Sequence, residues 1–223
     1  MLVTGANRGI GLEFVRSFAG DGWRVHACAR NIERAQELRA VAGDVVHHRL
    51  DVADGLKAAG LARTLADEAI DVLINNAGVY GPRSGFGATD YDAWAEVLQV
   101  NTLAPLRMVE RFAGLIEKSA HKTVINISSR MGSIGENTSG GDYIYRSSKA
   151  ALNMVTKSLA IDLAGRGITV ISFHPGWVQS DMGGPGAAIA PATSVAGMRQ
   201  VIAGLGPADS GKFFNYDGAP IEW

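Results

Sequence analysis

The sequence predicts an α/β fold in which a doubly wound parallel sheet is flanked by helices on both faces. Segments typical of strands alternate with segments of ten or more residues typical of helices, and this alternation predicts βαβ units. Several strand segments are nearly continuous apolar runs, as expected when helices cover both faces of a sheet. A glycine-rich segment separates the first strand from the first helix. Residues 1–223 are expected to form a single domain.

The expected elements follow one another in a regular order. The first strand, at residues 2–4, is shorter than the usual length of about five or six residues, and we interpret it as shortened at its start. The helix after it places Ile10, Phe14 and Phe18 on one face. Further strands are expected at residues 23–29, 45–50, 71–75, 122–128 and 168–174. Further helices, the first of them capped by an asparagine, are expected at residues 31–42, 54–69, 91–118 and 143–164.

The composition argues against several classes of protein. Apolar residues make up 47% and charged residues 19% of the chain, which is typical of a globular domain and not of a disordered one. The formal net charge of −1 favours neither nucleic acid nor a membrane surface as a partner. The single cysteine, Cys28, lies in an apolar segment and is interpreted as a core residue. Without a signal peptide or a membrane-spanning apolar run, the protein is expected in the cytoplasm.

Residues 4–11 read TGANRGIG and lead into the first helix. Glycines let the backbone turn tightly and approach a pyrophosphate, and the N-terminus of a helix offers unpaired N–H groups to it. The spacing is G-x-x-x-G-x-G and not the general G-x-G-x-x-G, so the interpretation depends on the position after a strand and before a helix. The segment predicts a dinucleotide site in a Rossmann-like fold.

The second strand indicates which dinucleotide is bound. Sites selective for NAD tend to place an acidic residue about 20 residues past the glycines, where it binds the ribose 2′-hydroxyl. This chain has Ala29-Arg30-Asn31 there, with no carboxylate. Arg30 is available for a 2′-phosphate, and Arg8 adds a second cation within the glycine-rich loop. We therefore predict that NADP(H) is preferred over NAD(H), although a single arginine at a strand end often serves only solvation.

Two further motifs point to acid–base chemistry at a carbonyl. Tyr145 and Lys149 are four residues apart on an expected helix and share a face, so the ammonium is expected to lower the pKa of the phenol. Such a phenol is a usable acid or base near neutral pH. Ser128 and Ser129 end an apolar strand at the edge where doubly wound sheets bind ligands, and a serine hydroxyl there can hydrogen-bond a carbonyl oxygen. Each motif alone is also compatible with a solvated surface pair or a turn serine.

Asn101 lies in a stretch where the long helix is expected to kink. Pro105 has no N–H to donate to the carbonyl of Asn101, so the helix at residues 91–118 is interrupted there. The freed carbonyl could hold an ordered water, or the kink could serve packing alone.

Together these stretches resemble the short-chain dehydrogenase/reductase family, in its smaller single-domain branch. The resemblance implies that Tyr145 donates a proton to a carbonyl and that Lys149 lowers the pKa of that tyrosine and holds the nicotinamide ribose. It also implies that Asn101 holds a relay water and that Ser129 orients the substrate oxygen. Ser129 fits this role better than Ser128, because the family has serine three residues before a glycine. The matching positions span nearly the whole chain in the family's order, namely residues 4–11, Asp51-Val52, residues 75–78, Asn101, Ser129, Tyr145, Lys149 and Pro175-Gly176.

The resemblance also implies where the cofactor binds. Asp51 and Val52 are expected to contact adenine, and the turn after the last predicted strand is expected to pack near the nicotinamide. The full set of expected cofactor-binding residues is Gly5, Asn7, Arg8, Gly9, Ile10, Gly11, Arg30, Asp51, Val52, Asn76, Ala77, Gly78, Tyr145, Lys149, Pro175, Gly176 and Val178.

Residues 128–153 and 210–223 bring the chain closest to the subgroup of bacterial C-factor signalling proteins and insect sniffer carbonyl reductases. This implies an NADP(H)-dependent oxidoreductase that reduces a ketone or an aldehyde, or alternatively a cell–cell signalling protein that keeps the nucleotide-binding fold. A sugar-nucleotide epimerase would need a larger C-terminal domain. A serine hydrolase would need a G-x-S-x-G elbow, which is missing.

The substrate is expected to be a small, modestly hydrophobic carbonyl compound. Tyr80, Met131, Trp177 and Met182 are the candidate pocket residues, because they lie near the carboxyl edge of the expected sheet. Residues 177–198 are expected to form a mobile substrate loop. No metal site is predicted. The resemblance is compatible with a homodimer or a homotetramer, but apolar helix faces also suit a core, so the sequence leaves the oligomeric state open.

Overall fold

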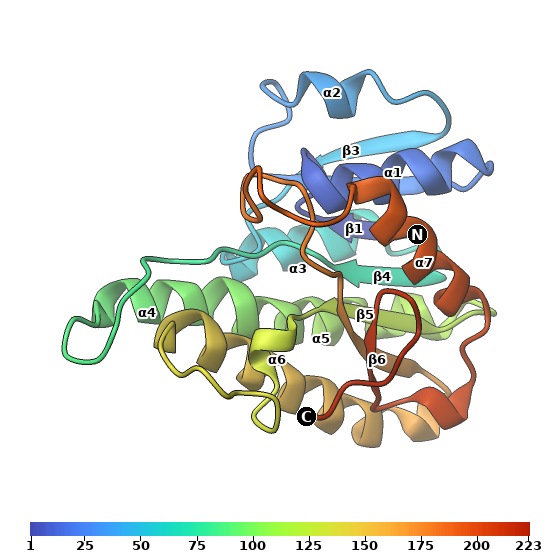
Figure 1. Ribbon diagram of the computed structural model, residues 1–223. Coiled ribbons are helices and arrows are strands. Elements are labelled where there is room, and N and C mark those ends of the chain that lie inside the picture. Colours follow the sequence, from blue (N-terminus) through green and yellow to red (C-terminus); the bar gives the residue numbers. More distant parts are fainter.

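A seven-stranded sheet forms the centre of the molecule (Figure 1). The computed structural model describes residues 1–223. The strands are β1 (Leu2–Thr4), β2 (Val25–Ala29), β3 (Val45–Arg49), β4 (Val72–Asn75), β5 (Thr123–Ile127), β6 (Thr169–His174) and β7 (Phe213–Asn215). They run parallel in the order β3-β2-β1-β4-β5-β6-β7, so the direction of winding reverses between β1 and β4. The predicted doubly wound α/β fold is confirmed.

Helices connect the strands and cover the sheet. They are α1 (Gly9–Gly20), α2 (Gln36–Arg39), α3 (Gly55–Thr64), α4 (Tyr91–Leu98), α5 (Ala104–Glu117), α6 (Tyr143–Asp162) and α7 (Pro191–Ala203). A π-helical segment, Gln99–Leu103, lies between α4 and α5, and short 3₁₀ turns lie at Arg130–Gly132, Ala164–Arg166 and Pro207–Asp209. None of the helices combines the length and the hydrophobicity that crossing a lipid bilayer requires.

Two apolar clusters, one on each face of the sheet, hold the helices in place. Phe14 of α1 and Met198 of α7 belong to the cluster on one face, and Phe112 of α5 belongs to the cluster on the other. Successive residues of a strand point to opposite faces, and accordingly Val3 joins the first cluster and Leu2 the second. Burial on both faces explains why the strands read as apolar runs.

The helix expected at residues 31–42 is much shorter in the structure. Asn31 Oδ1 accepts the backbone N–H of Arg34 at 3.1 Å and closes a turn. Ala35 then has φ −88° and ψ 63°, outside the helical region, and α2 begins only at Gln36. The prediction that this asparagine caps a long helix was therefore wrong, because its side chain stabilises a turn instead.

The interruption expected near Asn101 is confirmed. The π-helical segment Gln99–Leu103 contains Asn101 and lies directly between the end of α4 and the start of α5. Pro105 is the second residue of α5, where a missing N–H is tolerated. The segment turns the chain between two helices that the sequence suggested as one.

One helix, α7, and one strand, β7, near the end of the chain were not predicted from the sequence. Residues 191–198, expected within a mobile loop, form the first part of α7, with Pro191 at the position that favours proline. The loop is thus limited to residues 177–190, and a bridge between Val178 and Ile189 closes its base. β7 pairs with β6 and extends the sheet.

Candidate active site

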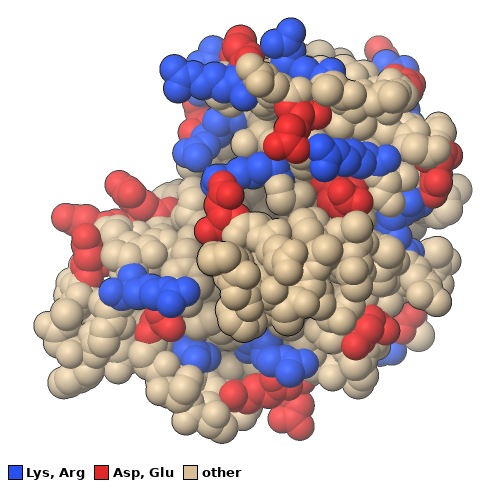
Figure 2. All heavy atoms as spheres, turned by 45° about the horizontal axis from the view of Figure 1, so that its top comes forward, with Lys and Arg blue, Asp and Glu red and all other residues tan.

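A cleft of about 580 Å³ lies at the carboxyl edge of the sheet, beside the switch point between β1 and β4. It reaches from the glycine-rich loop after β1 to Tyr145 on α6 and is bordered by the loop after β6. On the face shown in Figure 2, charged side chains of both signs gather around a hollow in the upper half, and uncharged residues form the centre below it. Doubly wound sheets bind ligands at such a position.

The glycine-rich loop has the geometry that its glycines permit. Gly5 and Gly9 have φ of +66° and +53°, a region that other residues seldom adopt. A Cβ at Gly11 would lie 2.2 Å from the carbonyl oxygen of Gly5, so no side chain fits there. The Asn76 amide donates to the carbonyl oxygens of Thr4 at 2.9 Å and Gly5 at 3.2 Å, which ties this loop to the end of β4.

Charged residues surround the part of the cleft near β2 and α2. Arg30 is exposed at the cleft wall and has no ion-pair partner. Arg8 instead pairs with Asp181 of the loop after β6. Arg16 of α1 pairs with Glu37 of α2 at 2.8 Å, and both line the cleft. Glu37 therefore lies on the cleft wall.

Asn101 fastens the loop after β4 to α6. Its side-chain amide donates to the carbonyl oxygen of Val79 at 2.8 Å and to Ser148 Oγ at 3.0 Å, and its Oδ1 accepts the N–H of Val79 at 2.9 Å. Asn101 is fully buried. Both hydrogens of the Asn101 amide have protein acceptors, so any water that Asn101 holds must donate to a carbonyl oxygen of this residue.

The two serines after β5 have different surroundings. Ser128 donates to Asn153 Oδ1 at 2.6 Å, and this bond joins the end of β5 to α6. Ser129 lies beside the Tyr145 hydroxyl, where its hydroxyl acts to lower the pKa of that phenol. Ser129 Oγ also accepts the N–H of Met131 at 3.2 Å, which orients it.

Tyr145 and Lys149 are almost completely buried at the inner end of the cleft. Burial raises the pKa of Tyr145 above its ordinary value, which is opposite to the direction expected from a neighbouring ammonium. The Lys149 ammonium points elsewhere, since its Nζ donates to the carbonyl oxygen of Ile127 at 2.9 Å and lies 5.8 Å from the centre of the Tyr145 ring. Burial also lowers the pKa of Lys149 to about 8.

Two of the four expected pocket residues contact Tyr145, and a third contacts Tyr80. The rings of Tyr80 and Tyr145 stack with centroids 4.2 Å apart. The sulfur of Met182 lies 3.9 Å from the Tyr145 hydroxyl, and that of Met131 lies 3.5 Å from the Tyr80 hydroxyl. Met182 is the one of the four that lines the cleft, and Trp177 is 58% exposed.

The loop after β6 brings some expected residues to the cleft and not others. Pro175 lines the cleft, whereas Gly176 and Val178 do not. Gly176 has φ +83°, and a Cβ there would lie 2.6 Å from Ile189, so this glycine shapes the loop. Trp177 Nε1 donates to the carbonyl oxygen of Gly183 at 2.9 Å and has the same role.

The other expected cofactor-binding residues all line the cleft, namely Gly5, Asn7, Arg8, Gly9, Ile10, Gly11, Arg30, Asp51, Val52, Asn76, Ala77, Gly78, Tyr145 and Lys149. Sequence reasoning missed several residues of the wall, among them Glu13, Arg16, Glu37, Val79, Val100, Gln179, Ser180, Asp181 and Ala190. Those after β6 follow the Pro-Gly turn directly and could have been included. No short-range signal marks the pair of Arg16 and Glu37.

The chain is similar to a known family and to several known proteins. A family model described as short chain dehydrogenase matches residues 1–188. C-signal of Myxococcus xanthus is 47% identical over 154 residues, which cover 69% of this chain and 93% of that protein. The structure of the carbonyl reductase Sniffer of D. melanogaster is 34% identical with a TM-score of 0.95, over 100% of this chain and 98% of that one. NADPH-bound carbonyl reductase from chicken fatty liver is 36% identical with a TM-score of 0.91, over the same shares of 100% and 98%.

Proposed function

The chain belongs to the short chain dehydrogenase family, and we propose that it reduces a ketone or an aldehyde to an alcohol with NADPH. The observation that carries this proposal is the continuity of the cleft, which joins the glycine-rich loop to the Tyr145 hydroxyl. A dinucleotide at the loop and a carbonyl at the tyrosine would share one space. The similarity to two carbonyl reductases supports this reaction.

The residues present fit a dinucleotide with a 2′-phosphate. The N-terminus of α1, which the glycine-rich loop leads into, suits a pyrophosphate. Arg30, which has no partner in the protein, is free to pair with a 2′-phosphate. The NADPH-bound carbonyl reductase from chicken fatty liver supports the same preference for NADP(H) over NAD(H).

Tyr145 is the proposed proton donor. When bound, the nicotinamide supplies the hydride for the carbonyl carbon. The Tyr145 phenol is protonated at neutral pH, the state that a donor to the carbonyl oxygen needs, and burial moves its pKa further above that range. Ser129 beside it donates a second hydrogen bond to that oxygen as negative charge develops.

Lys149 and Asn101 are proposed to assist this proton transfer. Lys149, one helical turn after Tyr145, carries donors that can hold the nicotinamide ribose, and its ammonium stabilises a phenolate once the proton has left. The backbone carbonyl of Asn101 holds a relay water in this proposal. Through Val79 and Ser148, the Asn101 side chain fixes the wall opposite Lys149.

The wall around Tyr145 suits a small apolar carbonyl compound. Met182 lines the cleft beside the Tyr145 hydroxyl, and Tyr80, which stacks on Tyr145, contacts Met131. Methionine side chains adapt to irregular shapes, so several related carbonyl compounds are expected to be accepted.

The test begins with titration of the purified protein by NADPH and NADH, followed by nicotinamide fluorescence. A panel of aldehydes and ketones is then added to the tighter complex. Binding of NADPH in preference to NADH, with oxidation by at least one carbonyl compound, is the expected result. Equal affinity for the two cofactors would remove the assignment of Arg30.

The similarity to C-signal supports a second candidate function, a signalling protein that keeps the nucleotide-binding fold. The same experiment separates the two. Tight NADPH binding without turnover across a broad panel would favour signalling. Tyr145 and Lys149 line one cleft, and Ser129 lies beside the Tyr145 hydroxyl. This arrangement favours the reductase, because a binding module has no evident need for a proton donor.

A further inference from the structure

The loop between β3 and α3 forms the wall at the outer end of the cleft. Asp51 and Val52 both line the cleft. The Asp51 carboxylate bonds only to the N–H of Ala53, through Oδ1 at 3.1 Å, and the backbone N–H of Val52 has no protein acceptor. The wall thus presents a free acceptor beside a free donor, which matches the donor and acceptor on the edge of a purine such as adenine.

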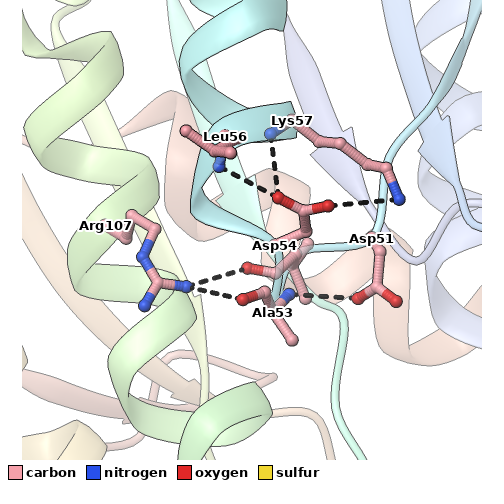
Figure 3. Close-up of polar contacts among 7 residues, drawn as sticks. Asp51, Ala53, Asp54, Leu56, Lys57 and Arg107 are labelled. Carbon is pink, nitrogen blue, oxygen red and sulfur yellow. Dashed lines mark hydrogen bonds and ion pairs between the residues drawn. The ribbon is translucent and has the colours of Figure 1, made fainter.

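Local hydrogen bonds shape this loop (Figure 3). The bond from Ala53 to Asp51 closes a tight turn. Asp54 caps α3 by accepting the N–H groups of Leu56 at 3.0 Å and Lys57 at 3.2 Å, and its other oxygen pairs with the Lys57 ammonium at 3.2 Å. All of these bonds join residues at most three apart, so they define the turn but not its place against the rest of the protein.

Val52 packs into the apolar cluster that includes α5, and Arg107 of α5 supplies the long-range polar attachment. Its Nη1 donates to the carbonyl oxygen of Ala53 at 3.0 Å and to that of Val52 at 3.5 Å (Figure 3). No other side chain from outside the loop hydrogen-bonds to it. Gly55 leaves the guanidinium room, since a Cβ there would lie 3.1 Å from Arg107 Cδ.

Arg107 does not line the cleft, so it does not touch the ligand itself. We propose that Arg107 is a positioning residue for the adenosine half of the dinucleotide, an inference that rests on the proposed NADPH-dependent function. By donating hydrogen bonds to the carbonyl oxygens of Val52 and Ala53, Arg107 sets the orientation of the backbone that faces adenine. A bond from a cationic donor is stronger than a neutral one, which suits this task in a half-exposed loop. Arg107 also lies on the helix that directly follows Asn101, so both halves of the cleft depend on one helix.

The experiment compares Arg107→Met, which keeps the apolar stem, with Arg107→Lys, which keeps a cationic donor. Arg166→Met is the control, because Arg166 pairs with Glu117 at 2.8 Å away from the cleft. We measure the Kd of NADPH, the inhibition constant of adenosine 2′,5′-bisphosphate, and kcat at saturating NADPH. Arg107→Met is expected to weaken both ligands about tenfold and to leave kcat within about twofold, because only the adenosine wall is displaced.

Arg107→Lys is expected to recover most of the lost affinity, and Arg166→Met to match the wild type. Unchanged affinities in Arg107→Met, or an equal fall in affinity and kcat, would overturn the positioning role while the proposed function stands. A wild type that binds neither NADPH nor the bisphosphate would overturn both. Thermal unfolding of each variant separates misfolding from these outcomes, and Arg107→Lys remains informative should Arg107→Met unfold.

Discussion

The two ends of the cleft are built in different ways. At the inner end, Asn101, Tyr145 and Lys149 are 0%, 7% and 4% exposed, and the side chains of Asn101 and Lys149 are held by hydrogen bonds to the backbone of Val79 and Ile127. At the outer end, the side chains of Arg8 and Asp181 form an ion pair and are 66% and 73% exposed. Buried groups with fixed partners keep one geometry, whereas exposed ion pairs are weak and exchange partners readily.

This difference suits the two tasks proposed for the ends. Proton transfer requires a donor within hydrogen-bond reach of the carbonyl oxygen, so a rigid inner end is an advantage. Recognition of a phosphate requires cations that can leave their present partners at small cost. Changes at the inner end are therefore expected to affect turnover or global stability, and changes at the outer end to affect cofactor affinity.

The largest effect is expected from Tyr145→Phe, which keeps the ring and removes the proton donor. The kcat should fall by a factor of about 10²–10⁴, the usual contribution of general acid catalysis, while the Kd of NADPH stays near the wild-type value. Stopped-flow turnover and fluorescence titration measure the two quantities. Tyr143→Phe is the matched control, because Tyr143 lies on the same helix with no lysine four residues on. An active Tyr145→Phe variant would take this residue out of its role.

Lys149→Met is expected to stabilise the protein while it removes turnover. Burial lowers the pKa of Lys149 to about 8 from 10.5, so between these values the unfolded chain binds more protons than the folded one. Wild-type stability therefore rises with pH across this window and is lowest below it. The variant should exceed the wild type by about 1–2 kcal/mol at pH 7, with the advantage shrinking toward pH 10.5. Urea unfolding at both pH values checks this, with the exposed Lys157→Met as control.

The inner end could be predicted from the sequence because its geometry is local. Four residues of helix place Lys149 on the same face as Tyr145, and strand β5 carries Ser129 to the same edge of the sheet. What could not be predicted is the direction of the Tyr145 pKa. That direction follows from the depth to which Tyr145 is buried, which is not visible in a spacing.

The outer end was harder to predict because its contacts join distant parts of the chain. Arg8 and Asp181 are 173 residues apart, and Arg16 meets Glu37 only because α1 and α2 lie side by side. The same limit explains the missed α7 and β7. α7 packs against α1, and β7 becomes a strand by pairing with β6, so tertiary contacts decide both elements.

Arg30→Asp tests whether the unpaired cation reads the 2′-phosphate. Reversing the charge should shift the preference from NADPH toward NADH by about 1–3 kcal/mol, the range for a hydrogen bond to a charged group. The ratio of the two Kd values measures this shift, and kcat with saturating cofactor should stay close to the wild type. Arg111→Asp, an exposed reversal elsewhere, controls for overall charge. A ratio that does not change would assign the phosphate to another cation.

The smallest effect is expected from Asp181→Asn, because the ion pair that it breaks is exposed. Asp181 occupies Arg8, so in the wild type a 2′-phosphate has to compete with a carboxylate for this cation. Loss of the carboxylate should tighten NADPH binding by up to about fivefold, in line with 0.2–1 kcal/mol for a surface pair, and should affect NADH less. The gain should vanish when Arg8→Ala is combined with it, and Asp162→Asn should show none. A gain that persists without Arg8 would mean that Asp181 acts on the phosphate through its charge alone. The charges at the outer end would then act on the phosphate over a distance, and not through ion pairs that exchange one partner for another.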